Sequence, residues 1–199
     1  MREEQITFEE FSQANRGTQV IHLVDSLTQL GPLARARLEG ISECWRIAIE
    51  HTNDLDVIRR AHLVRYKPNS QGDSGWEYAG SVPYTVEEYA SVLSNANPSE
   101  YASISDLAQS MEKALLKDIV LVAAHDIGLN KRIIVDGVHR STGLVLLSNR
   151  VPGCLIQLLA GGHKVSIVEL RSRWAHVLYP CDFLEFHRKA PNAFCHIRT

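Results

Sequence analysis

The sequence predicts an α/β (α+β) protein, in which a small mixed sheet is flanked by helices. Two apolar runs, 119–124 and 132–135, have the length and composition of buried strands. An amphipathic stretch over 104–116 precedes them, and 139–147 has the pattern of a helix that directly follows the second run. Buried strands that alternate with amphipathic helices are typical of a sheet covered by helices.

Residues 1–102 are expected to form a mainly helical extension. The apolar residues of 8–14 have the spacing of a short amphipathic helix, and helical spacing continues over 20–30 until a Gly-Pro pair stops it. The run 44–49 suits either a strand or a buried helix, and its periodicity does not decide between them.

An aromatic-rich insertion, 66–101, interrupts this extension. It is dense in Gly, Ser, Asn and Pro, which predicts loop with one helix at about 85–94. It also holds 6 of the 14 aromatic residues of the chain. Two interpretations are open: a lid or recognition segment that offers ring faces to a ligand, and a long insertion pinned to the body by its aromatics, which we favour.

Residues 103–175 are expected to form the core of the fold. A Ser-x-x-Asp pattern that begins at Ser103 has the spacing of a capping box at a helix start. The segments 154–159 and 165–170 are two further strand candidates, with Gly161–Gly162 as the hairpin turn between them.

Length and composition bound the class of protein. The chain has 199 residues, 45% hydrophobic and 22% charged, which suits a single domain over 1–199, with residues 176–199 as a C-terminal helix and tail. No apolar run approaches the roughly 18 residues that a membrane span needs. The N-terminus is acidic and does not have the apolar core of a secretory signal. We therefore expect a cytoplasmic protein without a membrane partner.

The net charge of −2 hides an asymmetry. Residues 1–100 carry 9 basic and 15 acidic side chains, and residues 101–199 carry 12 basic and 8 acidic ones, so the first part has a charge of −6 and the second +4. This balance argues against a strongly basic nucleic-acid protein and leaves room for a local anion site in the second half.

The four cysteines stand alone and form no C-x-x-C pair. We expect reduced thiols, mostly in the core. A set drawn from Cys181, His187, Cys195 and His196 matches no familiar zinc spacing, so no zinc site is predicted.

The segment 132–147, R-I-I-V-D-G-V-H-R-S-T-G-L-V-L-L, is the candidate for chemistry. A buried strand ends at Gly137 and a helix begins within two residues, which leaves backbone N–H groups without partners at the positive end of the helix. Arg140 adds a guanidinium fork, and Ser141 and Thr142 add two hydroxyls. Together these features predict a phosphate cradle. The chain has neither a P-loop motif nor a G-x-G-x-x-G after a strand, so those two nucleotide-binding classes are not supported.

The order of helix, strand, turn, strand and then D-G-V-H-R at a helix start resembles the ParB/sulfiredoxin superfamily, whose members place such a turn against nucleotide phosphates. The resemblance covers about 104–150, with an extension to 171. Val138 stands where sulfiredoxins have a nucleophilic Cys, and His139 stands where partition proteins have the first Arg of G-E-R-R, so neither subgroup is expected. The D-G-x-H-R form looks closest to the free-serine-kinase-type members, and it also resembles ParB-like proteins attached to nucleic-acid modification systems.

The resemblance implies roles for seven consecutive residues. The residues expected to bind a nucleotide (ATP or ADP) through its phosphates are Gly137, Val138, His139, Arg140, Ser141 and Thr142. Asp136, His139 and Arg140 would be the catalytic residues, and Asp136 would also hold Mg²⁺ beside the phosphates. A simple helix N-cap explains Asp136 equally well.

The leading expectation is a small-molecule kinase, which transfers a phosphoryl group from a nucleotide to a small hydroxyl-bearing molecule with Mg²⁺. One alternative is a non-catalytic or slowly hydrolysing nucleotide-binding switch. Another is a nucleic-acid modification or nuclease-like protein whose aromatic segment stacks bases, although nucleic acid is not the favoured partner.

A kinase also needs a general base for the acceptor hydroxyl. Glu43, Glu50 and Asp54 are candidates, and nothing in the sequence singles one out. His125 falls on the turn side of the predicted hairpin, opposite the motif, so we do not expect it to be catalytic. Exposed charges at a strand end explain the segment around Arg171 better than a phosphate contact does.

Overall fold

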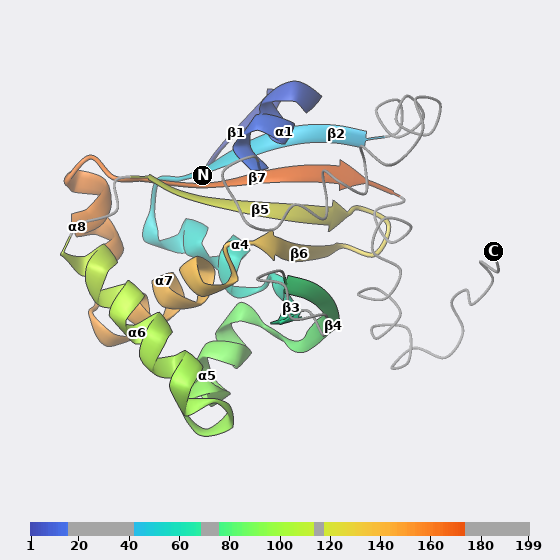
Figure 1. Ribbon diagram of the computed structural model, residues 1–199. Helices are drawn as coiled ribbons and strands as arrows, with labels where there is room; N and C mark the ends of the chain where they lie inside the picture. The colour runs from blue at the N-terminus through green and yellow to red at the C-terminus, as the bar shows by residue number, and fades with distance from the viewer. Residues whose placement is uncertain (16–41, 69–75, 114–117, 174–199) are drawn as a thin grey trace.

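The computed structural model describes residues 1–15, 42–68, 76–113 and 118–173, and for 64–68 and 76–83 it describes the backbone alone. A seven-stranded mixed sheet runs through the molecule (Figure 1) in the order β1-β2-β7-β5-β6-β3-β4. The strands are β1 (Arg2–Ile6), β2 (Ser42–Ile49), β3 (His62–Pro68), β4 (Trp76–Thr85), β5 (Asp118–Asp126), β6 (Lys131–Asp136) and β7 (Lys164–Ser172).

Two strand pairs of this sheet are parallel, β5 with β7 and β3 with β6, and the others are antiparallel. The three strands predicted at 119–124, 132–135 and 165–170 are confirmed as β5, β6 and β7. The ambiguous run 44–49 is a strand, since it lies within β2 and pairs with both β1 and β7.

Helices lie on both faces of the sheet. They are α1 (Phe8–Asn15), the 3₁₀ helix η1 (Thr52–Leu55), α4 (Asp56–Arg59), α5 (Val86–Ala96), α6 (Pro98–Glu112), α7 (Val138–Arg150) and α8 (Cys154–Ala160). Side chains of α4 to α8 form the larger core with one sheet face, which includes Leu121. The next residue, Val122, points to the other face and packs in a smaller core with Phe11 of α1. In Figure 1, α1 accordingly lies beside β1 and β2, apart from the other helices.

Helices α6 and α7 pack closely, and this packing positions the start of α7. A Cβ at Gly143 would lie 3.6 Å from Met111 Cε and 3.7 Å from the carbonyl oxygen of Ile104. The glycine therefore lets the α7 backbone approach the side of α6.

The expectation that residues 1–102 are mainly helical is not confirmed by the part that the structure describes. These residues also contribute β1 to β4, which form both edges of the sheet, and the helices predicted at 8–14 and 85–94 are confirmed as α1 and α5. The prediction of loop with one helix over 66–101 is wrong where β3 and β4 pair. Strand propensity depends strongly on context, so the local sequence did not identify these strands.

Two further elements differ from the prediction: the segment 154–159 and the start of α6. The segment 154–159 is not a strand but α8, which buries Leu155 and Leu158 at helical spacing, so Gly161–Gly162 lies in a helix-to-strand connection and not in a hairpin. Helix α6 begins at Pro98 with Asn97 as its N-cap, six residues before the predicted N-cap at Ser103. Pro at N1 and Asn at N-cap are both favoured at helix starts. The helix predicted over about 180–189 lies outside the described residues.

Within the described ranges, no single helix is long and apolar enough to cross a membrane; the bent pair α7 and α8 reaches that length and composition only when the two are taken together.

Candidate functional site

The candidate site is the turn from β6 into α7. Gly137 is the N-cap of α7 and has a φ of 88°, which is a left-handed conformation. A Cβ here would lie only 2.6 Å from Leu121 Cδ2. Backbone conformation and packing therefore both require glycine at this position. Since a glycine has no side chain to cap the helix, the first-turn N–H groups of α7 are not satisfied by their N-cap residue.

Asp136 and Arg140 form an ion pair across this turn. Arg140 Nη2 donates to Asp136 Oδ2 at 2.5 Å, and the Arg140 guanidinium also lies over Gly137, with Nε 3.4 Å from the position of a Cβ. Asp136 is 7% exposed, whereas the Arg140 side chain is 30% exposed. The cationic partner is therefore the one that a ligand reaches first.

Burial controls the protonation of Asp136. It raises the pKa of this carboxyl group, and the charge of Arg140 and the hydrogen bond from the Gly137 backbone only partly oppose the effect. A carboxylate that is costly to keep charged gains from a cation placed against it. Asp136 therefore fits the role of a Mg²⁺ carboxylate beside phosphates. The alternative that Asp136 is a simple helix N-cap is wrong, because Gly137 holds that position.

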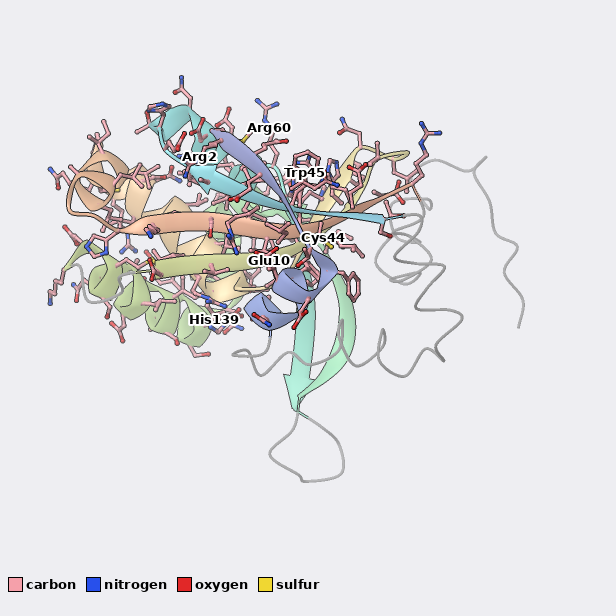
Figure 2. The ribbon with its side chains drawn as sticks, turned by 90° about the horizontal axis from the view of Figure 1, so that it is seen from above. Arg2, Glu10, Cys44, Trp45, Arg60 and His139 are labelled. Carbon is pink, nitrogen blue, oxygen red and sulfur yellow. The ribbon has the colours of Figure 1, made fainter. Side chains whose placement is uncertain are left out.

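His139 lies in the first turn of α7 and faces α6. Its Nε2 atom is 3.4 Å from Oε1 of Glu100, and its side chain is 54% exposed. Figure 2 shows His139 beside α6 at the edge of the molecule. The structure thus brings Asp136, His139 and Arg140 together at one helix start, as the sequence predicts.

Ser141 and Thr142 occupy a different position from the one expected for phosphate ligands. Both are fully buried, and both hydroxyls donate to the carbonyl oxygen of Val138, at 2.9 and 2.8 Å. Val138 itself is partly buried and packs against both cores. In this geometry the hydroxyls of Ser141 and Thr142 stabilise the first turn of α7 from its buried side, and the side chains that solvent reaches are those of His139 and Arg140.

The candidate general bases named from the sequence lie elsewhere. Glu43 accepts a hydrogen bond from Trp45 Nε1 at the start of β2. Glu50 and Asp54 lie near the N-terminal ammonium group, which is 2.6 Å from Asp54 Oδ2. Strands β7 and β5 separate β2 from β6, so these carboxylates do not reach the turn.

Glu100 is the site residue that the sequence reasoning missed. Its local signal was present, since Asn97 and Glu100 have N-cap and N3 spacing around Pro98. That pattern predicts a helix start but not its neighbour, because the contact with His139 depends on how α6 packs on α7.

A magnesium ion at this turn would have one protein carboxylate. Among the described residues, no group of three or more His, Cys, Asp or Glu side chains could hold a metal ion. Mg²⁺ in phosphate sites is commonly bound by one or two carboxylates, with phosphate oxygens and waters as the other ligands. Asp136 alone is therefore a sufficient protein contribution to such a site.

No protein-family model, curated protein or solved structure matches this chain.

Proposed function

We propose that this chain binds a nucleotide through its phosphates at the start of α7 and, with Mg²⁺, transfers a phosphoryl group to a small hydroxyl-bearing molecule. The observation that carries the proposal is the juxtaposition of Gly137, Asp136 and Arg140. It combines an N-cap glycine in a left-handed backbone conformation, a guanidinium group whose side chain is 30% exposed, and a buried carboxylate.

Each part of this turn has a chemical task in phosphoryl transfer. The N–H groups of the first turn and the guanidinium of Arg140 stabilise phosphate oxygens. If phosphate oxygens engaged Arg140, Asp136 would be the carboxylate that could hold Mg²⁺. The metal would supply charge neutralisation on the phosphates, and the carboxylate would hold it in place.

A nucleotide-binding switch that hydrolyses slowly or not at all would use the same turn. It differs from a kinase only in lacking an acceptor, so turnover and not binding separates the two. The third alternative, a nucleic-acid modification protein, predicts strong salt-dependent DNA binding without nucleotide.

The test is a thermal-shift titration with ADP and ATP, each with and without Mg²⁺. Wild type should melt at a higher temperature with a nucleotide, since a ligand that binds the native state stabilises it by mass action. R140A should lose that shift. R150A is the matched control, because Arg150 lies at the other end of α7 and donates to Tyr101 and Ser105. If no nucleotide stabilises wild type, or if R140A responds like R150A, the proposal fails.

A further inference from the structure

Transfer to a hydroxyl requires a group that takes its proton, and the structure supplies one beside the phosphate turn. We propose that His139 is the general base of the reaction and that Glu100 is its positioning residue. This inference rests on the proposed function, and it assigns the proton acceptor that the sequence left open.

Glu100 is held rigidly in place. Asn97, the N-cap of α6, donates from Nδ2 to Glu100 Oε2 at 2.8 Å and accepts from the Glu100 backbone N–H through Oδ1 at 3.2 Å. One carboxylate oxygen is thus engaged within α6, and the other, Oε1, is directed at His139 Nε2. The Glu100 side chain is 25% exposed, so solvent competes with this contact only in part.

The carboxylate determines which nitrogen of His139 carries the proton. A carboxylate only accepts hydrogen bonds, so the neutral imidazole must place its proton on Nε2 to satisfy Glu100. The Nδ1 atom then has a free lone pair. At 3.4 Å the contact is longer than an ideal hydrogen bond, as catalytic hydrogen bonds often are before the substrate binds.

The proton and electron balance of the step is simple. The acceptor oxygen forms a bond to the γ-phosphorus of ATP (the β-phosphorus of ADP), and the bond from that phosphorus to the bridging oxygen breaks, with its electron pair leaving on the shorter nucleotide. The proton of the acceptor hydroxyl moves to Nδ1 of His139, and the resulting imidazolium is stabilised by Glu100. Asp136 does not compete for this role, because Arg140 or a cation engages it.

The alternative explanation of Glu100 is helix capping alone, and the chain contains a matched control for it. Thr85 and Glu88 form a capping box at the start of α5, with Glu88 Oε2 2.8 Å from the Thr85 backbone nitrogen, whereas Glu100 accepts from the side chain of the N-cap residue Asn97. E88A and E100A each remove a carboxylate that bonds the N-cap residue of its helix. Only E100A also removes the partner of His139.

The first experiment needs no substrate. Nitrogen-15 spectra of the histidine rings should show His139 in wild type with its proton on Nε2. The His139 signal should show a mixture of both tautomers in E100A and should match wild type in E88A, where any change should fall on His62. A mixture in wild type, or the same spectrum in wild type and E100A, would overturn the positioning role of Glu100.

The second experiment measures turnover with ADP or ATP, Mg²⁺ and L-serine as the acceptor probe, and nucleotide hydrolysis with water as acceptor. H139A should lower kcat by about 10²–10⁴-fold, the usual contribution of a general base, with nucleotide Kd changed less than about threefold, and added imidazole should restore part of kcat. E100A should lower kcat in the same direction, and E88A should not.

The outcomes separate the two proposals. If H139A binds nucleotide and keeps most of its turnover, the base assignment falls and the proposed function stands. If wild type binds nucleotide but transfers to neither L-serine nor water, the base assignment falls together with the transfer step of the proposed function, and nucleotide binding alone stands. If wild type binds no nucleotide, the proposed function itself fails, and the base assignment fails with it.

Discussion

Two buried carboxylates in the central strands have opposite environments. Glu169 of β7 lies opposite Ala123 of β5, is fully buried and is bonded by Arg132 and Arg171. Asp136, at the end of β6, is 7% exposed and has one guanidinium partner, Arg140. The same residue types therefore make a closed network around Glu169 and an open pair at Asp136.

The closed network follows directly from strand register. Arg171, His125 and Arg132 are Cα partners across β7, β5 and β6, so all three lie on one face in a row. Glu169 accepts from Arg132 Nε at 2.5 Å, and His125 Nδ1 lies 3.6 Å from its Oε1. Arg171 also stacks on the Trp45 ring, 4.7 Å from its centroid. Each guanidinium in this row already has its carboxylate.

The pKa values of Glu169 and Asp136 are shifted in opposite directions. Burial by itself raises the pKa of Glu169, but hydrogen bonds from His125, Arg132 and Arg171 outweigh it and hold the pKa at about 2. At Asp136 burial prevails, and the pKa is raised. A carboxylate that is stabilised as an anion serves the fold, whereas one left short of positive charge is ready to take a cation.

The largest expected effect is on the free energy of unfolding when the network around Glu169 is broken. E169A should lower the free energy of unfolding by about 3–5 kcal/mol, because it leaves the partly buried Arg132 without a carboxylate and Arg171 with Glu3 alone. D136N should change it by at most about 1 kcal/mol, since Arg140 can turn to water. Urea unfolding followed by circular dichroism measures both values. Equal losses of unfolding free energy in the two variants would contradict the contrast between the Glu169 network and the Asp136–Arg140 pair.

The next effect is on the pH dependence of stability. Glu169 binds fewer protons in the folded state than in the unfolded state between about pH 2 and its ordinary pKa of 4.5, so its contribution is lost as the pH falls through that window. The lost contribution amounts to about 3 kcal/mol. Asp136 has the opposite sign: with a pKa raised above 3.8 it binds more protons when folded, so stability falls as the pH rises through the window above 3.8.

Unfolding curves of wild type, E169Q and D136N from pH 2 to pH 7 test these signs. E169Q should flatten the rise in stability from pH 2 to 4.5, and D136N should remove a decrease above pH 3.8. If both variants change the curve in the same direction, the two carboxylates are not in opposite environments.

A smaller loss of stability is expected from alanine at Gly137, in the turn between β6 and α7, and alanine at Gly153 is its control. Both glycines are helix N-caps with similar left-handed φ values, 88° and 81°, but a Cβ at Gly153 would meet nothing within 4 Å. G153A should cost about 1 kcal/mol for backbone strain alone, and G137A about 1–3 kcal/mol because Leu121 must also move. Thermal unfolding measures the two costs, and the account is contradicted if G153A is the more damaging variant.

The sequence predicted the turn from β6 into α7 better than the rest of the fold. Strand, glycine and helix are contiguous from Arg132 to Arg140, so local pattern was enough to place Asp136, His139 and Arg140 together. The inward direction of Ser141 and Thr142 depends on which face of α7 meets α6, and Gly143 reveals that only once the two helices are packed.

The first half of the chain was harder for a physical reason. β1 pairs with β2, and β2 with β7, more than a hundred residues further along, so their register is decided by long-range hydrogen bonds. Arg2 to Gln5 are exposed along an edge strand, and their charges conceal its strand character. Glu100 could be recognised as a capping residue, but its contact with His139 is a property of packing.

The most direct test of the central claim is the backbone amide spectrum of nitrogen-15-labelled protein titrated with ADP and Mg²⁺. The account predicts that the largest shifts occur at the amides of Gly137, Val138, His139 and Arg140, with little change at Arg132, His125 and Glu169. Shifts that centre on Arg132, His125 and Glu169, or no saturable shift at all, would contradict it.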